Sequence, residues 1–305
     1  MSPGECLRKR VSNGGTLPLV GVYDSFSTAL AARRFEGVFL SGFGFAASYY
    51  GLPDVGFMAW PDMVQFAARA RAVAPKTHLI VDIDDGFADD NVAIHVAKEL
   101  QRSGASGAIL EDQARPRRCG HLNGKILLPL DAYLNRLNGV LESCSDLFII
   151  ARTDATDPGE IRERVSAFSE TNADAILVDG QGSLDSIQQL RTLTDKPLAF
   201  NQILGGKSPA MPLSELDRAG VAMAILSTPL LFSAQAAMQQ CLDDLHENDV
   251  RLDAVGSTVR LSECQEVLEE NWHLASHFNA QETRDLPNSG RDEMACELVQ
   301  TFRSE

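Results

Sequence analysis

Two apolar runs of this sequence end abruptly at carboxylates. The first is Val81-Asp82-Ile83-Asp84, and the second is Leu110-Glu111-Asp112. Residues two apart share one side of an extended strand, so Asp82 and Asp84 are expected to point the same way. Carboxylates held a few ångströms apart repel unless a cation neutralises them, and hard oxygen ligands favour Mg²⁺, with Mn²⁺ as the alternative. We therefore predict a divalent-cation site at Asp82, Asp84 and Glu111; ordinary acids on a solvated loop are the competing interpretation.

A polar loop follows the second run, from Gln113 to Lys125, and we call it the lid loop. It carries Arg117-Arg118-Cys119-Gly120-His121. Flanking cations and a nearby imidazole lower the pKa of a thiol, so Cys119 is expected to be useful in proton transfer or nucleophilic attack. A loop of this length is typical of an active-site lid, which makes Arg117 and His121 candidate catalytic residues as well. The competing interpretation is a free cysteine on a basic loop.

Arg152 ends a third apolar run, Ile149-Ile150-Ala151. The planar fork of its guanidinium suits bidentate binding of a substrate carboxylate. A structural salt bridge to Asp154 or Asp179 is the competing interpretation.

Ser41-Gly42-Phe43-Gly44 follows a fourth run. Glycines allow close approach of the backbone, and successive N–H groups there could hold a carboxylate or an oxyanion. A tight turn without further function is the alternative. Leu52-Pro53-Asp54 adds another carboxylate close by in the sequence, and Asp54 joins the candidate metal ligands.

These residues must be positioned by a regular alternation of short β-rich runs and amphipathic stretches. Near-continuous apolar runs suit strands buried on both faces of a parallel sheet. Eight such strands are predicted, at Pro18–Val22, Gly37–Ser41, His78–Asp82, Gly107–Glu111, Leu147–Arg152, Asp174–Val178, Pro197–Asn201 and Val221–Leu226. Eight strands favour a closed (β/α)8 TIM barrel, and no GxGxxG follows the first strand to support a dinucleotide-binding fold. Active sites of such barrels lie at the carboxyl ends of the strands, where Tyr23, Asp179 and Asn201 also fall.

The sequence divides into two parts. We predict a catalytic barrel over residues 1–245 and a C-terminal helical arm or tail over residues 246–305. The tail is expected to hold a helix at Leu261–His273 and then a loose end, because Pro287-Asn288-Ser289-Gly290 breaks any continuation.

Composition narrows the class of protein. The 305 residues carry a formal net charge of −15, and nucleic-acid binding needs a basic surface, so this excess argues against it. No signal peptide or membrane-spanning run is readable, and the six cysteines are scattered without a CxxC pair, so a cytoplasmic location is expected. The expected partner is a small anionic carboxylate, bound in a basic pocket within an acidic shell.

Taken in order, six motifs resemble the isocitrate lyase/phosphoenolpyruvate mutase superfamily over about residues 18–245. The similarity is greatest to its short-chain members: 2-methylisocitrate lyase, 2,3-dimethylmalate lyase, oxaloacetate hydrolase and carboxyphosphonoenolpyruvate mutase. The motifs are Ser41-Gly42-Phe43-Gly44, Leu52-Pro53-Asp54, Asp82-x-Asp84, Glu111-Asp112-Gln113, Cys119-Gly120-His121 and Ala151-Arg152-Thr153-Asp154.

The resemblance implies roles for these residues. Mg²⁺ would be held through Asp82, while the other three carboxylates (Asp54, Asp84 and Glu111) would act mostly through bound waters. Cys119 would be the general acid that protonates an enolate-like carbanion. Arg152 would be catalytic as well as bind a substrate carboxylate, because with the metal it would stabilise the negative charge that develops. His121 would contact the substrate and keep the lid loop in register. The remaining substrate-binding residues would be Ser41, Gly42, Phe43, Tyr23, Gly120, Asp179 and Asn201.

The implied reaction is cleavage of a carbon–carbon bond in a 2-hydroxy di- or tricarboxylate, giving a 2-oxo acid and a carboxylate. Three alternatives stay open: phosphorus–carbon bond formation of the carboxyphosphonoenolpyruvate mutase kind, hydrolysis or decarboxylation of oxaloacetate, and a non-catalytic barrel that binds a carboxylate. The resemblance also implies a homotetramer, a dimer of dimers, that exchanges the last barrel helix between subunits.

Several positions depart from the superfamily pattern, mostly on the substrate side. Arg117 stands where lyases carry lysine, and arginine is a poor proton shuttle because it stays charged. Asp85-Gly86-Phe87-Ala88 replaces Thr-Gly-Tyr-Gly, and Asp179 replaces a glutamate. Asn201-Gln202-Ile203-Leu204 replaces the Asn-x-Thr-Glu pattern. A small dicarboxylate is therefore favoured over the full tricarboxylate.

Overall fold

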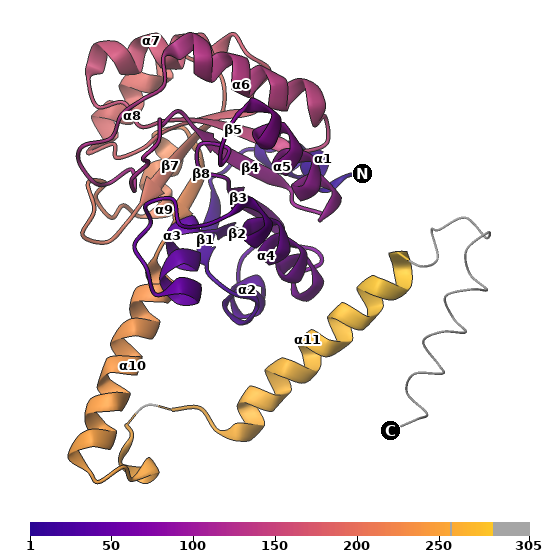
Figure 1. The fold of residues 1–305 in the computed structure, drawn as a ribbon, viewed down its shortest axis with the longest axis vertical. Helices are drawn as coiled ribbons and strands as arrows, with labels where there is room; N and C mark the ends of the chain where they lie inside the picture. Colours follow the sequence, from indigo (N-terminus) through magenta and orange to yellow (C-terminus); the bar gives the residue numbers. More distant parts are fainter. Residues whose placement is uncertain (257, 283–305) are drawn as a thin grey trace. The chain divides into compact units, whose positions relative to one another are not determined.

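Eight parallel strands close into a barrel in the order of the sequence (Figure 1). The structure, a computed structural model, describes residues 1–256 and 258–282. The barrel closes where the first strand pairs with the last, with Leu17 opposite Met223. The strands are β1 Leu17–Val22, β2 Gly37–Leu40, β3 His78–Asp82, β4 Gly107–Glu111, β5 Phe148–Thr153, β6 Ala175–Val178, β7 Leu198–Gln202 and β8 Val221–Leu226. The predicted (β/α)8 barrel is confirmed.

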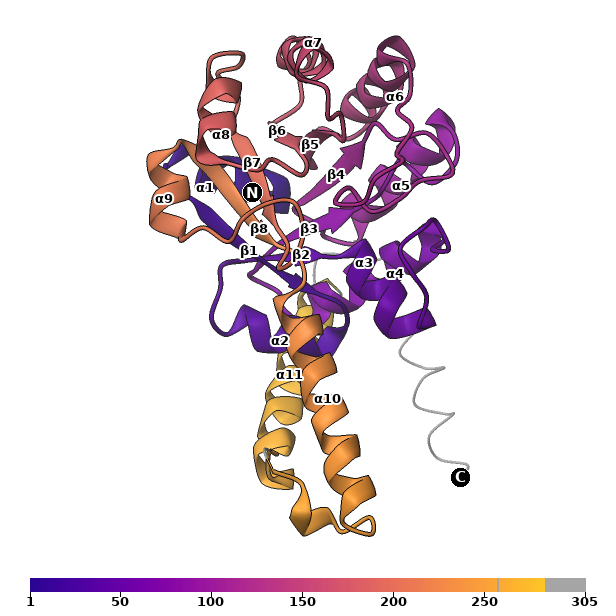
Figure 2. The same cartoon turned by 90° about the vertical axis from the view of Figure 1, so that its left-hand side faces the viewer.

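Helices surround the strands, as Figure 2 shows. Their amphipathic spacing explains this placement: α5 buries Ala93, Val96, Ala97 and Leu100, which follow one helical face. The helices between strands are α2 Ser25–Ala32, α3 Gly42–Phe45, the π-helix η1 Ala46–Tyr50, α4 Trp60–Val73, α5 Asp90–Arg102, α6 Leu130–Ser143, α7 Pro158–Ser169, α8 Leu184–Arg191 and α9 Leu213–Arg218.

The core has two layers because successive side chains of a strand point to opposite faces. In β1, Leu17 and Leu19 belong to the cluster inside the barrel, whereas Val20 and Val22 belong to the larger cluster between strands and helices. Both layers are continuous, so the strand ends are held rigidly and can position side chains precisely enough for chemistry.

The N-terminal helix α1, Pro3–Ser12, closes one end of the barrel. Its Leu7 and Val11 join the cluster inside the barrel. Its Arg8 donates to Asp174 and to the carbonyl oxygen of Leu147, which fixes the helix beside β5 and β6. The opposite end, at the carboxyl ends of the strands, is where the predicted site residues lie.

The C-terminal part forms α10 Pro229–Glu247, the 3₁₀ helix η2 Leu252–Ala254, and α11 Leu261–Glu282. The chain divides into two units, one of residues 1–259 and a second that begins at Arg260 and includes α11. The predicted helix begins at Leu261, as expected, and extends past His273. The predicted break at residues 287–290 lies outside the described residues, and the boundary at residue 245 and the exchange of a helix between subunits stay predictions. Within the described part of the chain, no helix is long and apolar enough to cross a membrane.

Candidate active site

Most of the predicted site residues converge on one small cavity at the carboxyl ends of the strands. The cavity has a volume of about 30 Å³, which holds only one or two water molecules. Eleven predicted residues line it: Ser41, Phe43, Asp54, Asp82, Arg117, Cys119, Gly120, His121, Arg152, Asp179 and Asn201. A dicarboxylate does not fit in this volume, so the lid loop must move to admit a substrate.

Four carboxylates gather around the guanidinium of Arg117. Arg117 is buried and pairs with Asp54, with Asp84 at 3.1 Å and with Glu111 at 2.9 Å. Asp82, the last residue of β3, lines the cavity beside them. Asp84 has a left-handed backbone conformation with φ of 50°, a strain of the kind that occurs at functional sites.

The carboxylate cluster (Asp54, Asp82, Asp84 and Glu111) is short of positive charge. Burial raises the pKa of Glu111 to about 8, although Arg117 and Arg152 oppose this shift. Burial also raises the pKa of Asp82 and of Asp84, even though Arg117 lies near both. Buried carboxylates remain costly to ionise here, and a further cation would relieve that cost.

The donor atoms of this cluster fit Mg²⁺. The buried oxygens Asp84 Oδ1 and Glu111 Oε2 are in ion pairs with Arg117 and Arg152 but accept no well-aligned hydrogen bond. Among the described residues, no three His, Cys, Asp or Glu side chains converge closely enough to hold an ion by themselves. Mg²⁺ does not require this, because it usually keeps several waters and binds one or two carboxylates directly. Asp82 is the candidate direct ligand, and the other three carboxylates would contact the ion through waters.

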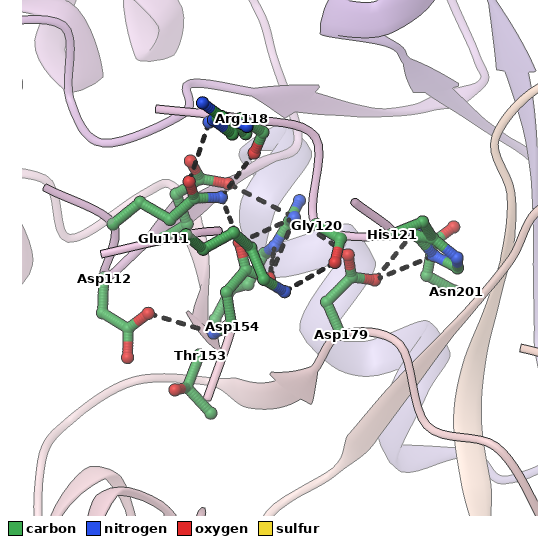
Figure 3. A network of polar contacts seen from close by, with 12 residues as sticks. Glu111, Asp112, Arg118, Gly120, His121, Thr153, Asp154, Asp179 and Asn201 are labelled. Atoms are coloured by element: carbon green, nitrogen blue, oxygen red, sulfur yellow. Dashed lines mark hydrogen bonds and ion pairs between the residues drawn. The ribbon is translucent and has the colours of Figure 1, made fainter. Parts of the chain in front are cut away.

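Arg152 belongs to a second polar network, of which Figure 3 labels Glu111, Asp154 and Asp179. Its Nη2 atom donates to Asp154 at 3.1 Å and to Asp179 at 3.0 Å, and lies 3.3 Å from Glu111. The competing interpretation of Arg152 as a salt-bridge residue is therefore correct for this state.

Asp179 is held in its ionised form. Burial alone would raise the pKa of Asp179, but Arg152, His121 and Asn201 outweigh burial and hold the pKa well below its usual range. Asn201 donates to Asp179 Oδ1 at 2.9 Å, and Ser227 in turn donates to Asn201 Oδ1 at 2.6 Å. This chain of hydrogen bonds fixes the wall of the cavity opposite the carboxylate cluster.

The thiol of Cys119 is the clearest correction to the sequence analysis. Burial raises its pKa to about 11, so the predicted lowering of the pKa is wrong. The physical reason is that Arg117 is turned into the carboxylate cluster, where its charge is already paired, and Arg118 is exposed. A thiol that keeps its proton at neutral pH is suited to act as a general acid rather than as a nucleophile.

The lid loop lies directly on the site. A Cβ atom on Gly120 would come within 1.9 Å of Asp179 Oδ2 and 2.4 Å of Arg152 Nη2, so only glycine allows this approach. At the start of the loop, Arg115 makes a bidentate pair with Asp85, with both distances at 2.8 Å. An antiparallel bridge between Gln113 and Leu127 closes the base of the loop.

The predicted carboxylate-binding turn is a helix start. Ser41 caps the short helix α3 by accepting from the Gly44 N–H at 3.0 Å. A Cβ atom on Gly42 would lie 3.1 Å from Asp82 Oδ2 and 3.4 Å from Asp84 Oδ1, so Gly42 borders the carboxylate cluster. Tyr23 lies apart from the cavity, in a surface pocket with Phe45. Since β1 ends at Val22, Tyr23 already belongs to the turn into α2, and its role in substrate binding stays a prediction.

Three residues that were not predicted as site residues also line the cavity: Phe39, Ile203 and Ser227. Ser227 directly follows β8, so the rule that site residues follow barrel strands could have identified it. Phe39 and Ile203 are apolar and carry no chemical signal in the sequence.

Residues 7–246 match the family model described as phosphoenolpyruvate phosphomutase. The chain belongs to this family. It is 32% identical over 254 residues to probable 2-methylisocitrate lyase 2 of Corynebacterium glutamicum, with 81% of each chain covered. The similarity spans the whole barrel and includes every predicted site residue, since these fall between residues 23 and 201.

Solved structures agree. A crystal structure of 2,3-dimethylmalate lyase, a PEP mutase/isocitrate lyase superfamily member, superimposes with a TM-score of 0.84 at 27% identity, covering 90% of this chain and 94% of that one. Oxaloacetate acetylhydrolase with the inhibitor 3,3-difluorooxalacetate gives a TM-score of 0.82 at 28% identity, covering 92% and 96%. The predicted superfamily is confirmed, and the chain is an enzyme of that superfamily.

Proposed function

We propose that this protein is a Mg²⁺-dependent carbon–carbon lyase that cleaves a 2-hydroxy di- or tricarboxylate into a 2-oxo acid and a second carboxylate. The observation that supports this most directly is the meeting of three features in one cavity. Asp82 of the carboxylate cluster, the buried guanidinium of Arg152 and the protonated thiol of Cys119 all line it. The relatives named as lyases of such acids support the same reaction class.

Each of these residues has a separate task. Mg²⁺ held at the carboxylate cluster would supply positive charge next to the oxygens of the bound acid. Arg152 would bind a substrate carboxylate in place of one of its present acidic partners. When the carbon–carbon bond breaks, the substrate hydroxyl gives its proton to a carboxylate of the cluster and becomes the oxo group. The electron pair of the broken bond stays on the departing enolate-like fragment, and Cys119 Sγ donates the proton that this carbon takes up. The closed lid loop keeps bulk water from that carbanion.

Release of a 2-oxo acid tests the proposal. Purified protein is mixed with methylisocitrate, dimethylmalate or citramalate in the presence of Mg²⁺, and oxo acid is trapped as its phenylhydrazone. We expect turnover of at least one of these acids, loss of turnover in EDTA, and recovery when Mg²⁺ is added back. Absence of oxo-acid release from all three, with the protein folded and Mg²⁺ present, would count against a lyase.

Hydrolysis of oxaloacetate is the second candidate. It is favoured by the small cavity, by the short side chain of Asp179 and by the similarity to oxaloacetate acetylhydrolase. Proton NMR separates the two reactions, because hydrolysis yields acetate and oxalate whereas the lyase reaction yields an oxo acid. Phosphorus NMR would reveal the mutase alternative through a new phosphorus–carbon bond.

We also propose a homotetramer that uses α10. None of the 19 residues of α10 is buried, and Met238 and Leu242 on it are exposed. An apolar pocket of about 400 Å³ lies beside the start of this helix and is lined by Ile203 and Phe232 among others. Light scattering that gives the mass of a monomer at micromolar concentration would contradict the tetramer.

The five described cysteines are free thiols, which supports a reducing, cytoplasmic location.

A further inference from the structure

Arg117 is an unusual residue to find inside a candidate metal site. Its side chain comes from the lid loop, and its guanidinium contacts three carboxylates that belong to different segments. Asp54 lies on the connection between η1 and α4, Asp84 follows β3, and Glu111 ends β4. Arg117 and each of its three partners are at least nine-tenths buried. The arginine is therefore the internal cation of the cluster in this state of the protein.

The arrangement of the carboxylates follows the guanidinium rather than an ion. No three acidic side chains of the described residues converge on one point. A guanidinium spreads its charge over a flat fork of several N–H donors, whereas a metal ion draws its ligands toward one centre. Asp84 Oδ1 lies 3.1 Å from Arg117 Nη2 and Glu111 Oε2 lies 3.3 Å from Arg152 Nη2, but neither oxygen accepts a well-aligned hydrogen bond, so the ion pairs satisfy the cluster incompletely.

We propose that Arg117 is a counter-cation built into the lid loop that opposes divalent-cation binding at the carboxylate cluster. The proposal rests on the proposed function only in placing the metal at that cluster. Two like charges a few ångströms apart in a buried site repel strongly, so each weakens the binding of the other. Such coupling is reciprocal. If Arg117 in the closed loop lowers the affinity for the cation by some factor, a bound cation lowers the equilibrium constant for loop closure by the same factor.

This coupling predicts the order of metal binding, opening of the lid loop, substrate binding and closure of the loop. With no metal bound, Arg117 holds the loop shut over a cavity too small for substrate. A divalent cation shifts the loop toward the open state, in which the cavity can be entered. An anionic substrate then restores the negative charge, so the loop can close again with Arg117 back in the cluster.

The test compares metal affinity in two variants of equal charge. Arg117→Gln removes the buried guanidinium, and Arg118→Gln removes the neighbouring exposed one. Binding of Mn²⁺ is followed by electron paramagnetic resonance of the free ion, and binding of Mg²⁺ by calorimetry, without substrate. We expect Arg117→Gln to bind both ions about tenfold more tightly or better than the wild type, and Arg118→Gln to match the wild type. Equal or weaker binding by Arg117→Gln overturns the proposal.

A second measurement uses the wild type and does not depend on a variant that folds. Tryptic cleavage after Arg118 and Lys125 in the lid loop is followed by mass spectrometry and normalised to cleavage elsewhere in the chain. We expect Mg²⁺ to speed lid-loop cleavage in the wild type and to leave it unchanged in Arg117→Gln. Unchanged or slower cleavage in the wild type contradicts the coupling. If neither the wild type nor any variant binds Mn²⁺ or Mg²⁺, the metal site of the proposed function fails instead.

Discussion

The Nδ1 atom of His121 accepts a hydrogen bond from the backbone N–H of Lys207, at 3.0 Å. A nitrogen that accepts in this way carries no proton, so the ring proton of neutral His121 lies on Nε2. That atom is 3.5 Å from Asp179 Oδ1. Lys207 also donates from Nζ to the carbonyl oxygen of Leu122 at 3.3 Å, so the connection between β7 and α9 holds the lid loop at two points.

Two substitutions separate the two contacts of His121. The amide oxygen of asparagine takes roughly the place of Nδ1, and the amide nitrogen of glutamine takes roughly the place of Nε2. We expect His121→Gln to lose the hydrogen bond with Lys207. Loss of the roughly 1 kcal/mol that such a bond contributes should make the lid loop open about fivefold more often. His121→Asn should keep the lid loop protected and weaken substrate binding through Asp179. Tryptic cleavage of the loop and the KM for the acid are the two measurements; identical profiles for both variants would contradict the assignment.

The barrel and most of the site could be predicted from the sequence because both follow local rules. Strand ends are marked by apolar runs that stop at polar residues, and barrel topology brings those ends to one rim. This places Asp82, Glu111 and Arg152 correctly. The state of Cys119 could not be predicted in this way. Its pKa depends on burial and on where the side chain of Arg117 turns, and neither quantity is set by neighbours in the sequence. The contact of His121 with Lys207 could not be predicted either, because the two residues lie 86 positions apart in the sequence.

Gly120 controls whether the lid loop can close. A methyl group there would overlap Asp179 Oδ2 and Arg152 Nη2, which are held in place by their own pair. We expect Gly120→Ala to fold with a normal melting temperature and to lose most of its turnover, by about a hundredfold or more, because the reacting groups are no longer brought together. Gly182→Ala is the matched control, since a Cβ atom at Gly182 meets nothing within 4 Å. Full activity of Gly120→Ala would show that the closed loop is not the active state.

The ion pair between Arg115 and Asp85 connects the lid loop to the segment Asp85-Gly86-Phe87-Ala88, which departs from the superfamily pattern. Asp85 is buried, and its carboxylate accepts both from Arg115 and from the Phe87 N–H at 3.0 Å. Removing the arginine breaks a bidentate, charge-assisted contact. The side chain of Arg115 is 38% exposed, so the expected cost is only about 1 kcal/mol.

We therefore expect Arg115→Ala to speed lid-loop cleavage about fivefold and to raise KM, with the melting temperature of the barrel little changed. Arg115→Lys keeps the charge but not the fork, and should lie between Arg115→Ala and the wild type. The Arg115–Pro116 bond resists trypsin in all three proteins, so the substitutions do not change the set of lid-loop cleavage sites. Wild-type cleavage rates in Arg115→Ala would show that this pair does not anchor the loop.

The raised pKa of Cys119 predicts how activity depends on pH. A thiol with a pKa of about 11 is at least about nine-tenths protonated up to pH 10, so a general acid at Cys119 keeps most of its protons between pH 7 and pH 10. We expect no alkaline loss of kcat in that range that follows the pKa of an ordinary thiol near 8.5. Alkylation of Cys119 by iodoacetamide at pH 8 should be at least about a hundredfold slower in the folded protein than in the same chain unfolded in urea, because only about one folded molecule in a thousand carries the thiolate.

Cys119→Ser provides the catalytic test of the same thiol. A serine hydroxyl fills nearly the same space but gives up its proton far less readily, so we expect kcat to fall by about 10² to 10⁴ while the protein still binds Mg²⁺ and an unreactive acid such as oxalate. The combination of lost turnover and retained binding distinguishes a general acid from a residue that shapes the cavity. A non-catalytic barrel would bind oxalate equally well with either residue and turn over nothing in both forms. Retention of wild-type kcat in Cys119→Ser would show that another group delivers the proton to the carbanion.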